Sequence, residues 1–271
     1  TSAAHGLSFT DRSLDSFADV AVEEAPIVWE PAIEVFQSDG VTPLASSPVR
    51  AGDSIVVKGS GFDPLANVGG RGMPIPATLP QGNYVVFGSF ASNWRPSTGA
   101  ASATRKVGSQ GWALTDSTFA GIPTQFQSIV AGQRVVLAAD GTFTWTAVIS
   151  DPDDLANGNF GVYTYGAGGV NNASQELYVP LNYAPPTRTT TTLEVLPTTP
   201  STVGEPTDLT ATVASTTGTP TGTVKFFDGN TEIGSQTLTG STATFSTTAL
   251  ASGNHQLKAT FVPTAVADFK T

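Results

Sequence analysis

The stretch DLTATV, residues 208–213, alternates strictly between polar and apolar side chains, with Leu209, Ala211 and Val213 on one face. The same two-residue period returns in TATFS at residues 242–246 and in QLKATF at residues 256–261. A period of two with one apolar face is typical of strands that cover one side of a hydrophobic core. These strands predict a β-sandwich in the C-terminal part of the chain.

Residues 31–184 show the same character with longer interruptions. No long segment has a 3.6-residue apolar period, and turn residues recur at intervals of about 8–12 residues. Asp140-Gly141 predicts a hairpin between two of the expected strands. Two long polar insertions, at 63–82 and 91–132, interrupt them. The expected strands are Ala32–Phe36, Ser54–Gly59, Asn83–Phe90, Arg134–Ala138, Thr142–Ile149, Asn159–Tyr165 and Glu176–Leu181.

Composition excludes several classes of protein. The 271 residues carry a net charge of −10, only 13% charged side chains and no cysteine. Disulfides, zinc–thiolate sites and cysteine nucleophiles are therefore excluded, and an acidic chain with 12 scattered Lys and Arg is not expected to bind nucleic acid. No stretch approaches the roughly 20 apolar residues of a membrane span. Hydroxyl-rich strands of low charge favour an extracellular location on a cell surface.

Three segments of the C-terminal part resemble the bacterial immunoglobulin-like repeats of large surface proteins. They are TTL at 191–193, GTPTGTVKFFDG at 218–229 and GNHQLKATF at 253–261. The resemblance implies a spacer domain without an active site. In these repeats a final strand follows the segment that here reads 263–270. The domain is therefore expected to lack its last strand, either because the sequence is cut short before it or because another segment supplies it.

The first domain resembles other secreted modules. GDSIVVKGSGFDP at 52–64 is similar to the opening of β-sandwich modules in actinobacterial secreted proteins. GNYVVFGSF at 82–90 and GVYTY at 161–165 resemble the module that accompanies HtaA-type haem-binding domains. This resemblance implies a surface location and a haem-uptake context, but it carries over no ligand residue.

These observations predict an all-β chain with two immunoglobulin-like β-sandwiches in tandem. We expect an N-terminal arm at 1–30, a sandwich with long loops at 31–184, a Pro-rich linker at 185–189 and a bacterial Ig-like domain at 190–271. The two prolines at the start of the linker hold the backbone extended and stiff.

Aromatic side chains are the first candidates for contact with a ligand or partner. Trp94 and Trp112 are expected in loops of the second insertion, where they could form a binding surface or plug the end of the sandwich. Tyr163 and Tyr165 lie on an expected strand, and tyrosine is one known haem ligand.

Oxygen ligands gather next to this strand. Asp151, Asp153, Asp154 and Asn157 supply the hard oxygens that calcium prefers, although a capped helical turn explains the same residues. Calcium is the one ion that this cluster would suit, and no other cofactor is expected.

The N-terminal arm suggests a route to assembly. An unpaired sheet edge is a template for strand addition, and head-to-tail exchange produces fibres. Apolar residues that could form the donated strand are Leu7, Phe9, Phe17, Val20 and Val22.

Catalysis is hard to build, since His5 and His255 are the only histidines and no Gly-x-Ser-x-Gly elbow is present. The sequence therefore predicts a non-enzymatic cell-surface protein, a spacer plus a contact domain, whose partners are other surface proteins or further copies of itself. Two alternatives stay open: a filament or surface-layer subunit assembled by strand exchange, and an accessory module of a haem-uptake protein.

Overall fold

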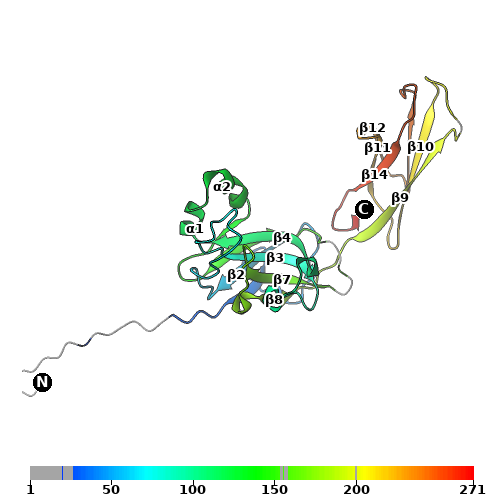
Figure 1. Cartoon of the computed structure of the whole chain (residues 1–271). Helices are drawn as coiled ribbons and strands as arrows, with labels where there is room; N and C mark the ends of the chain where they lie inside the picture. The colour runs from blue at the N-terminus through cyan, green and yellow to red at the C-terminus, as the bar shows by residue number, and fades with distance from the viewer. Residues whose placement is uncertain (1–19, 21–26, 153–154, 156–157, 199) are drawn as a thin grey trace, which may run out of the picture.

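The computed structural model describes residues 20, 27–152, 155, 158–198 and 200–271. They form two β-sandwiches that follow one another along the chain (Figure 1). Each sandwich has two sheets, so the predicted all-β class is confirmed.

The first sandwich packs a three-stranded sheet against a five-stranded sheet. The smaller sheet, in the order β1-β2-β6, contains β1 (Ala32–Gln37), β2 (Ser54–Ser60) and β6 (Phe143–Val148). The larger has the order β5-β4-β3-β7-β8. Its strands are β3 (Asn83–Phe90), β4 (Arg105–Leu114), β5 (Arg134–Val136), β7 (Asn159–Gly166) and β8 (Leu177–Pro180). Ile55, Phe87 and Trp145 belong to the core between the sheets.

All seven strands expected in this sandwich are present, each within two residues of its predicted ends. The prediction of one long loop over 91–132 is wrong. This segment contains strand β4, the helices α1 (Asp116–Ala120) and α2 (Thr124–Ala131), and the short 3-10 turns η2 (Pro96–Thr98) and η3 (Ser102–Thr104). A further turn, η4 (Ala173–Gln175), precedes β8. Trp112 consequently lies on a strand and not in a loop.

The prediction of a hairpin at Asp140-Gly141 is also wrong, because the two flanking strands do not pair with each other. The turn exists, with the Gly141 amide donating to the Ala138 carbonyl at 3.0 Å. However, β5 pairs in parallel with β4, whereas β6 pairs with β2 in the other sheet. The Asp-Gly turn therefore carries the chain from one sheet to the other.

The five-stranded sheet is covered on both faces. Val85 and Phe87 of β3 face the core between the sheets, while Val86 and Phe90 pack on the opposite, outer face. The loop at 63–82 contributes the fully buried Ile75 to that outer face, next to residues of the two helices. Because apolar side chains leave both faces of β3, the insertions form a second layer that shields the sheet from water.

The second sandwich pairs the sheet β13-β10-β9-β15 with the sheet β12-β11-β14. The inward residues of the predicted alternation, Leu209, Ala211 and Val213, are fully buried against Val224 and Phe226. The strands are β9 (Thr187–Leu196), β10 (Thr207–Ser215), β11 (Gly222–Asp228), β12 (Thr231–Thr237), β13 (Thr242–Thr247), β14 (Leu257–Pro263) and β15 (Phe269–Lys270). The last of these, β15, has two residues that pair in parallel with Thr187 and Arg188 of β9.

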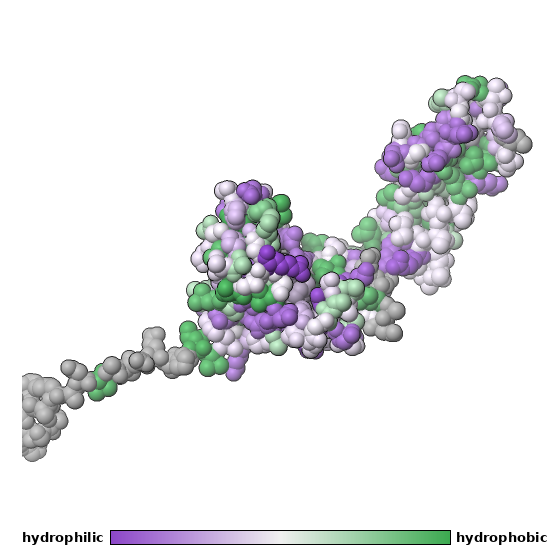
Figure 2. All heavy atoms as spheres, viewed as in Figure 1, coloured by the Kyte–Doolittle hydropathy of each residue, from purple (hydrophilic) through white to green (hydrophobic). Residues whose placement is uncertain are grey.

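Polar contacts join the two sandwiches at a narrow junction, visible between the two lobes in Figure 2. The Lys270 ammonium lies 2.7 Å from a carboxylate oxygen of Asp151, and both side chains are more than four-fifths buried. A second, exposed ion pair joins Arg50 to Asp268 at 3.2 Å. The backbone amide of Val49 donates to the carbonyl of Asn182 at 3.0 Å, which ties the end of the first sandwich to its own core.

Replacing Leu209 by Ala is expected to destabilise the second sandwich by about 2–5 kcal/mol, because it leaves a cavity in a fully buried site. Leu196→Ala, on the neighbouring strand and 47% exposed, is the matched control and is expected to cost far less. Urea unfolding followed by circular dichroism measures the difference. All four tryptophans lie before residue 146, so their fluorescence follows the first sandwich separately. If the two variants lost the same free energy of unfolding, this description of the packing would be contradicted.

Candidate functional site

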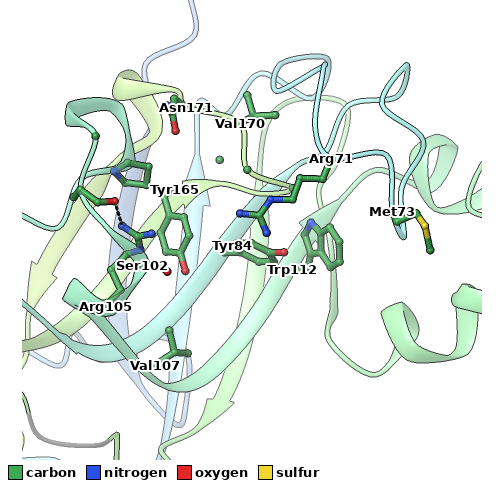
Figure 3. Close-up of a pocket in the computed structure, with 16 residues that line it drawn as sticks. Arg71, Met73, Tyr84, Ser102, Arg105, Val107, Trp112, Tyr165, Val170 and Asn171 are labelled. Atoms are coloured by element: carbon green, nitrogen blue, oxygen red, sulfur yellow. Dashed lines mark hydrogen bonds between the residues drawn. The ribbon is translucent and has the colours of Figure 1, made fainter.

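A pocket of about 570 Å³ opens on the outer face of the five-stranded sheet (Figure 3). Its floor consists of Tyr84 from β3, Trp112 from β4 and Tyr165 from β7. Its rim comes from the two insertions and from the turn at 166–171. Pockets of this size are typical of small-ligand sites.

The aromatic floor is packed into one unit. The Tyr84 ring lies 5.1 Å from the Trp112 ring and 5.6 Å from the Tyr165 ring, measured between centroids. The Trp112 indole N–H donates to the Gln81 carbonyl at 2.7 Å, so this polar atom is satisfied within the protein. The floor is therefore held in place before any ligand arrives.

A buried amide network fixes the loop that forms one wall. The Asn67 side-chain amide donates to the Gln175 side-chain oxygen at 2.7 Å and to the Gly82 carbonyl at 2.8 Å. Asn83 donates to the same Gln175 oxygen at 2.8 Å. Satisfied buried polar networks of this kind specify a single loop conformation.

Two arginines supply the charge of the pocket. Arg105 donates to the Trp94 carbonyl at 2.7 Å, and its guanidinium lies 5.5 Å from the centre of the Tyr165 ring. Arg71 is positioned by its backbone amide, which donates to the Gly168 carbonyl at 2.9 Å. Among the described residues no acidic side chain lines the pocket.

Both tyrosines of the floor are neutral donors at physiological pH. Burial raises the pKa of Tyr165 to about 12, and the nearby Arg105 offsets only part of this effect. Burial also raises the pKa of Tyr84, against the opposing influence of a Gly168 backbone hydrogen bond and the charge of Arg71. Each phenol can therefore donate a hydrogen bond to a ligand.

The four predicted contact residues gather on this outer face, but at two depths. Trp112 and Tyr165 line the pocket. Trp94 is 3% exposed and packs beneath it, 5.0 Å from the Tyr163 ring. Tyr163 is 1% exposed and stacks at 4.0 Å on Phe90. The indole of Trp94 thus fills the layer that supports the pocket and is not itself a contact surface.

Tyr163 is also poorly placed to bind haem iron. Its hydroxyl donates to the Asn159 carbonyl at 2.6 Å, and burial raises its pKa. Both effects oppose the tyrosinate that ligates iron.

The residues expected to bind calcium are only partly described. Asp153, Asp154 and Asn157 lie outside the described residues. Both carboxylate oxygens of Asp151 are engaged: one accepts from Tyr183 at 2.6 Å and the other from Lys270 at 2.7 Å. Asp151 therefore serves the junction between the sandwiches, which favours the alternative interpretation of this segment as a capped turn over a calcium site.

The described residues contain no group of three or more His, Asp or Glu placed to hold a metal ion. No helix among them is long and apolar enough to cross a membrane. His255, the one histidine that is described, is bonded to Asp228 at 2.6 Å and to the Ala251 carbonyl at 3.0 Å in the second sandwich.

Sequence reasoning missed Arg71, Arg105 and Tyr84. The sequence did contain one indication that the two arginines are functional. The chain has few basic residues, and Arg71 lies in one long insertion and Arg105 in the other. Loops that long inside a compact domain are often functional. That Arg71 and Arg105 lie close to Tyr165 could be seen only in the folded structure.

A comparison with known protein families finds a match, which covers the second sandwich. Residues 191–269 match the bacterial Ig-like domain (group 3) family, as the resemblance of the second domain implied. No curated protein matches the chain. Among solved structures, the fibronectin(III)-like modules of Clostridium thermocellum CbhA match at 13% identity over 88% of each chain, with a TM-score of 0.27.

Calcium is expected to leave the melting temperature unchanged, because an ion at Asp151 would have to displace Lys270 and Tyr183. Binding to the folded state alone, at about 100 times the Kd, would stabilise the protein by about 2.7 kcal/mol. Differential scanning calorimetry with calcium, and with magnesium as the control, makes the comparison. A rise of several degrees with calcium alone would contradict the expectation and restore the calcium site.

Proposed function

We propose that this chain is a non-enzymatic extracellular protein of the cell surface, in which an Ig-like spacer carries a contact domain. The observation that carries the proposal is the preformed pocket on the outer face of the first sandwich, next to a domain of the bacterial Ig-like family. In this proposal the pocket recognises the partner, and the second sandwich holds the contact domain away from the surface to which the protein is attached.

The junction between the sandwiches supports this division of roles. The mostly buried Lys270–Asp151 pair joins the end of the second sandwich to the loop after β6, and Tyr183 of the first sandwich donates to the other oxygen of Asp151. Phe269 and Val266 line one pocket together with Val148 and Ile149 at the same junction. A charged pair with an additional hydrogen bond favours one geometry over a free hinge. A contact domain held in this way keeps its pocket at a defined orientation.

The make-up of the pocket fits binding better than catalysis. It is lined by cations, phenols and glycines, with no carboxylate or histidine among the described lining residues that could act as a general base. Its groups can hold a ligand by hydrogen bonds and charge, which is sufficient for adhesion.

The labelled full chain is expected to bind saturably to some members of an array of immobilised cell-surface glycans and matrix proteins. Ser102→Trp, which places a bulky side chain at the exposed rim of the pocket, is expected to weaken that binding at least about tenfold. Ser92→Trp, at an exposed position outside the pocket, is the matched control and should bind like the original chain. No saturable binding, or equal binding by the Ser102 variant, would contradict the proposal.

A second function, self-assembly through strand donation, is favoured by the edges of the second sandwich. In the described structure β14 pairs with β11 alone, and β15 covers only Thr187 and Arg188 of the outer edge of β9. The inward side chains along these edges are only half-buried, although they pack on the core: Leu193, Val195, Leu257 and Ala259. An added strand would bury them.

We place the donor in the N-terminal arm of another copy. Of the candidate donor residues, Val20 is 78% exposed, and Leu7, Phe9, Phe17 and Val22 lie outside the described residues. Light scattering coupled to size exclusion is expected to show oligomers for the full chain and a monomer after deletion of residues 1–25. A full chain that stays near 27.8 kDa at every concentration, or oligomers that survive the deletion, would overturn this second function.

A further inference from the structure

The pocket concentrates positive charge in an acidic protein. Arg71 and Arg105 both line it, and the chain as a whole has a net charge of −10. Within the described structure, neither arginine forms an ion pair with a carboxylate. Two like charges in one pocket repel each other, and an anionic ligand relieves this repulsion.

The two arginines differ in how much of their hydrogen-bonding capacity is used. Arg105 is held by the Trp94 carbonyl at 2.7 Å and the Ala100 carbonyl at 3.4 Å, and its guanidinium carbon lies 5.5 Å from the centre of the Tyr165 ring. Arg71 is exposed, and its guanidinium makes no hydrogen bond or ion pair with the described part of the chain. Arg105 therefore serves as a fixed positive charge, while Arg71 presents a donor fork to a ligand.

The backbone opposite Arg71 leaves room for this fork. Gly169 has a φ of +84°, and a Cβ at this position would lie 2.9 Å from the Arg71 Nε. A side chain at this position would require the Arg71 side chain to shift from the place it now occupies. In Figure 3 the Arg71 head group extends over Tyr84 toward Tyr165, with Arg105 on the far side of Tyr165.

The geometry of the charged groups suits an oxyanion such as a carboxylate. A guanidinium is planar and presents two parallel N–H groups, which match two oxygens of a carboxylate or of a phosphate. The remaining lining offers neutral donors and acceptors, from the Tyr84 and Ser102 hydroxyls and the Asn171 amide, beside the aromatic ring of Tyr165. Such a surface suits a ligand with several hydroxyls and a flat apolar face.

We infer that the pocket binds a carboxylated saccharide, with Arg71 on the carboxylate and the sugar ring against Tyr165. The volume of about 570 Å³ accommodates a ligand of one or two sugar rings. This inference names the ligand class of the contact site and so rests on the proposed function. Trp112, at the floor, gives the site an intrinsic fluorescence reporter.

Isothermal titration of the full chain with digalacturonate, and with neutral galactobiose as the uncharged counterpart, tests the inference. We expect digalacturonate to bind at least about tenfold more tightly than the neutral sugar, with an affinity that falls as salt is added. Arg71→Gln should abolish the preference, and Arg71→Lys, which keeps the charge but loses the fork, should retain only part of it. Arg95→Gln, at an exposed arginine outside the pocket, is the matched control and should leave both affinities unchanged.

Equal affinity for the charged and neutral sugars, or an unchanged preference in Arg71→Gln, would overturn the inference. A galactose 6-sulfate or galactose 6-phosphate that binds as tightly as digalacturonate would overturn the assignment of a carboxylate. The circular dichroism of each variant verifies that the sandwich is folded.

The glycan array separates this inference from the proposed function. Suppose that the chain binds the array saturably, and that Ser102→Trp abolishes this binding whereas Arg71→Gln leaves it intact. This result would support the contact function and would reject the carboxylated ligand. Digalacturonate binding that depends on Arg71, in a chain that binds no immobilised surface, would keep the ligand class and reject the adhesive function.

Discussion

The burial of strand β3 on both faces is the constraint on which the first sandwich depends. One set of its side chains, Val85 and Phe87, fills the core between the sheets, and the other, Val86 and Phe90, needs a separate cover. A two-layer sandwich covers only the face of β3 that points into the core. The insertions at 63–82 and 91–132 cover the outer face, and most of their large apolar side chains pack there.

The pocket follows from this second layer. A loop that covers a sheet buries backbone and amide groups, which must find partners, and the network of Asn67, Asn83 and Gln175 satisfies them. The cover is incomplete between the two insertions, where the aromatic floor meets Arg71 and Arg105. The side chains proposed to recognise a ligand are thus held by the same packing that keeps the sheet dry, and the Lys270–Asp151 pair joins the second sandwich to the first.

Much of the fold was predictable because period-two alternation survives wherever only one face of a strand is buried. This holds for β10, where Leu209 to Val213 match the structure residue by residue. Strand β4 was missed because its sequence, RKVGSQGWAL, lacks the alternation; a Cβ at Gly108 would lie 2.1 Å from the Ser150 carbonyl oxygen, so close backbone approach selects glycine there. Trp112 and Tyr165, which the sequence offered as contact residues, line the pocket, whereas Trp94 is buried, as the alternative of a plug would require. The grouping of Arg71 with Tyr165 depends on long-range pairing that no local pattern encodes.

The central claim is that the insertions form a fixed layer and that the pocket exists before a ligand binds. Amide hydrogen exchange of the ligand-free chain, measured by NMR, tests it most directly. The Arg71 amide, bonded to the Gly168 carbonyl, and the Gln81 amide, bonded to the Asn67 carbonyl, lie within the cover. We predict that both exchange at least about a hundredfold more slowly than in an unstructured peptide. Unprotected rates at both amides, while those of β3 remain slow, would contradict the account.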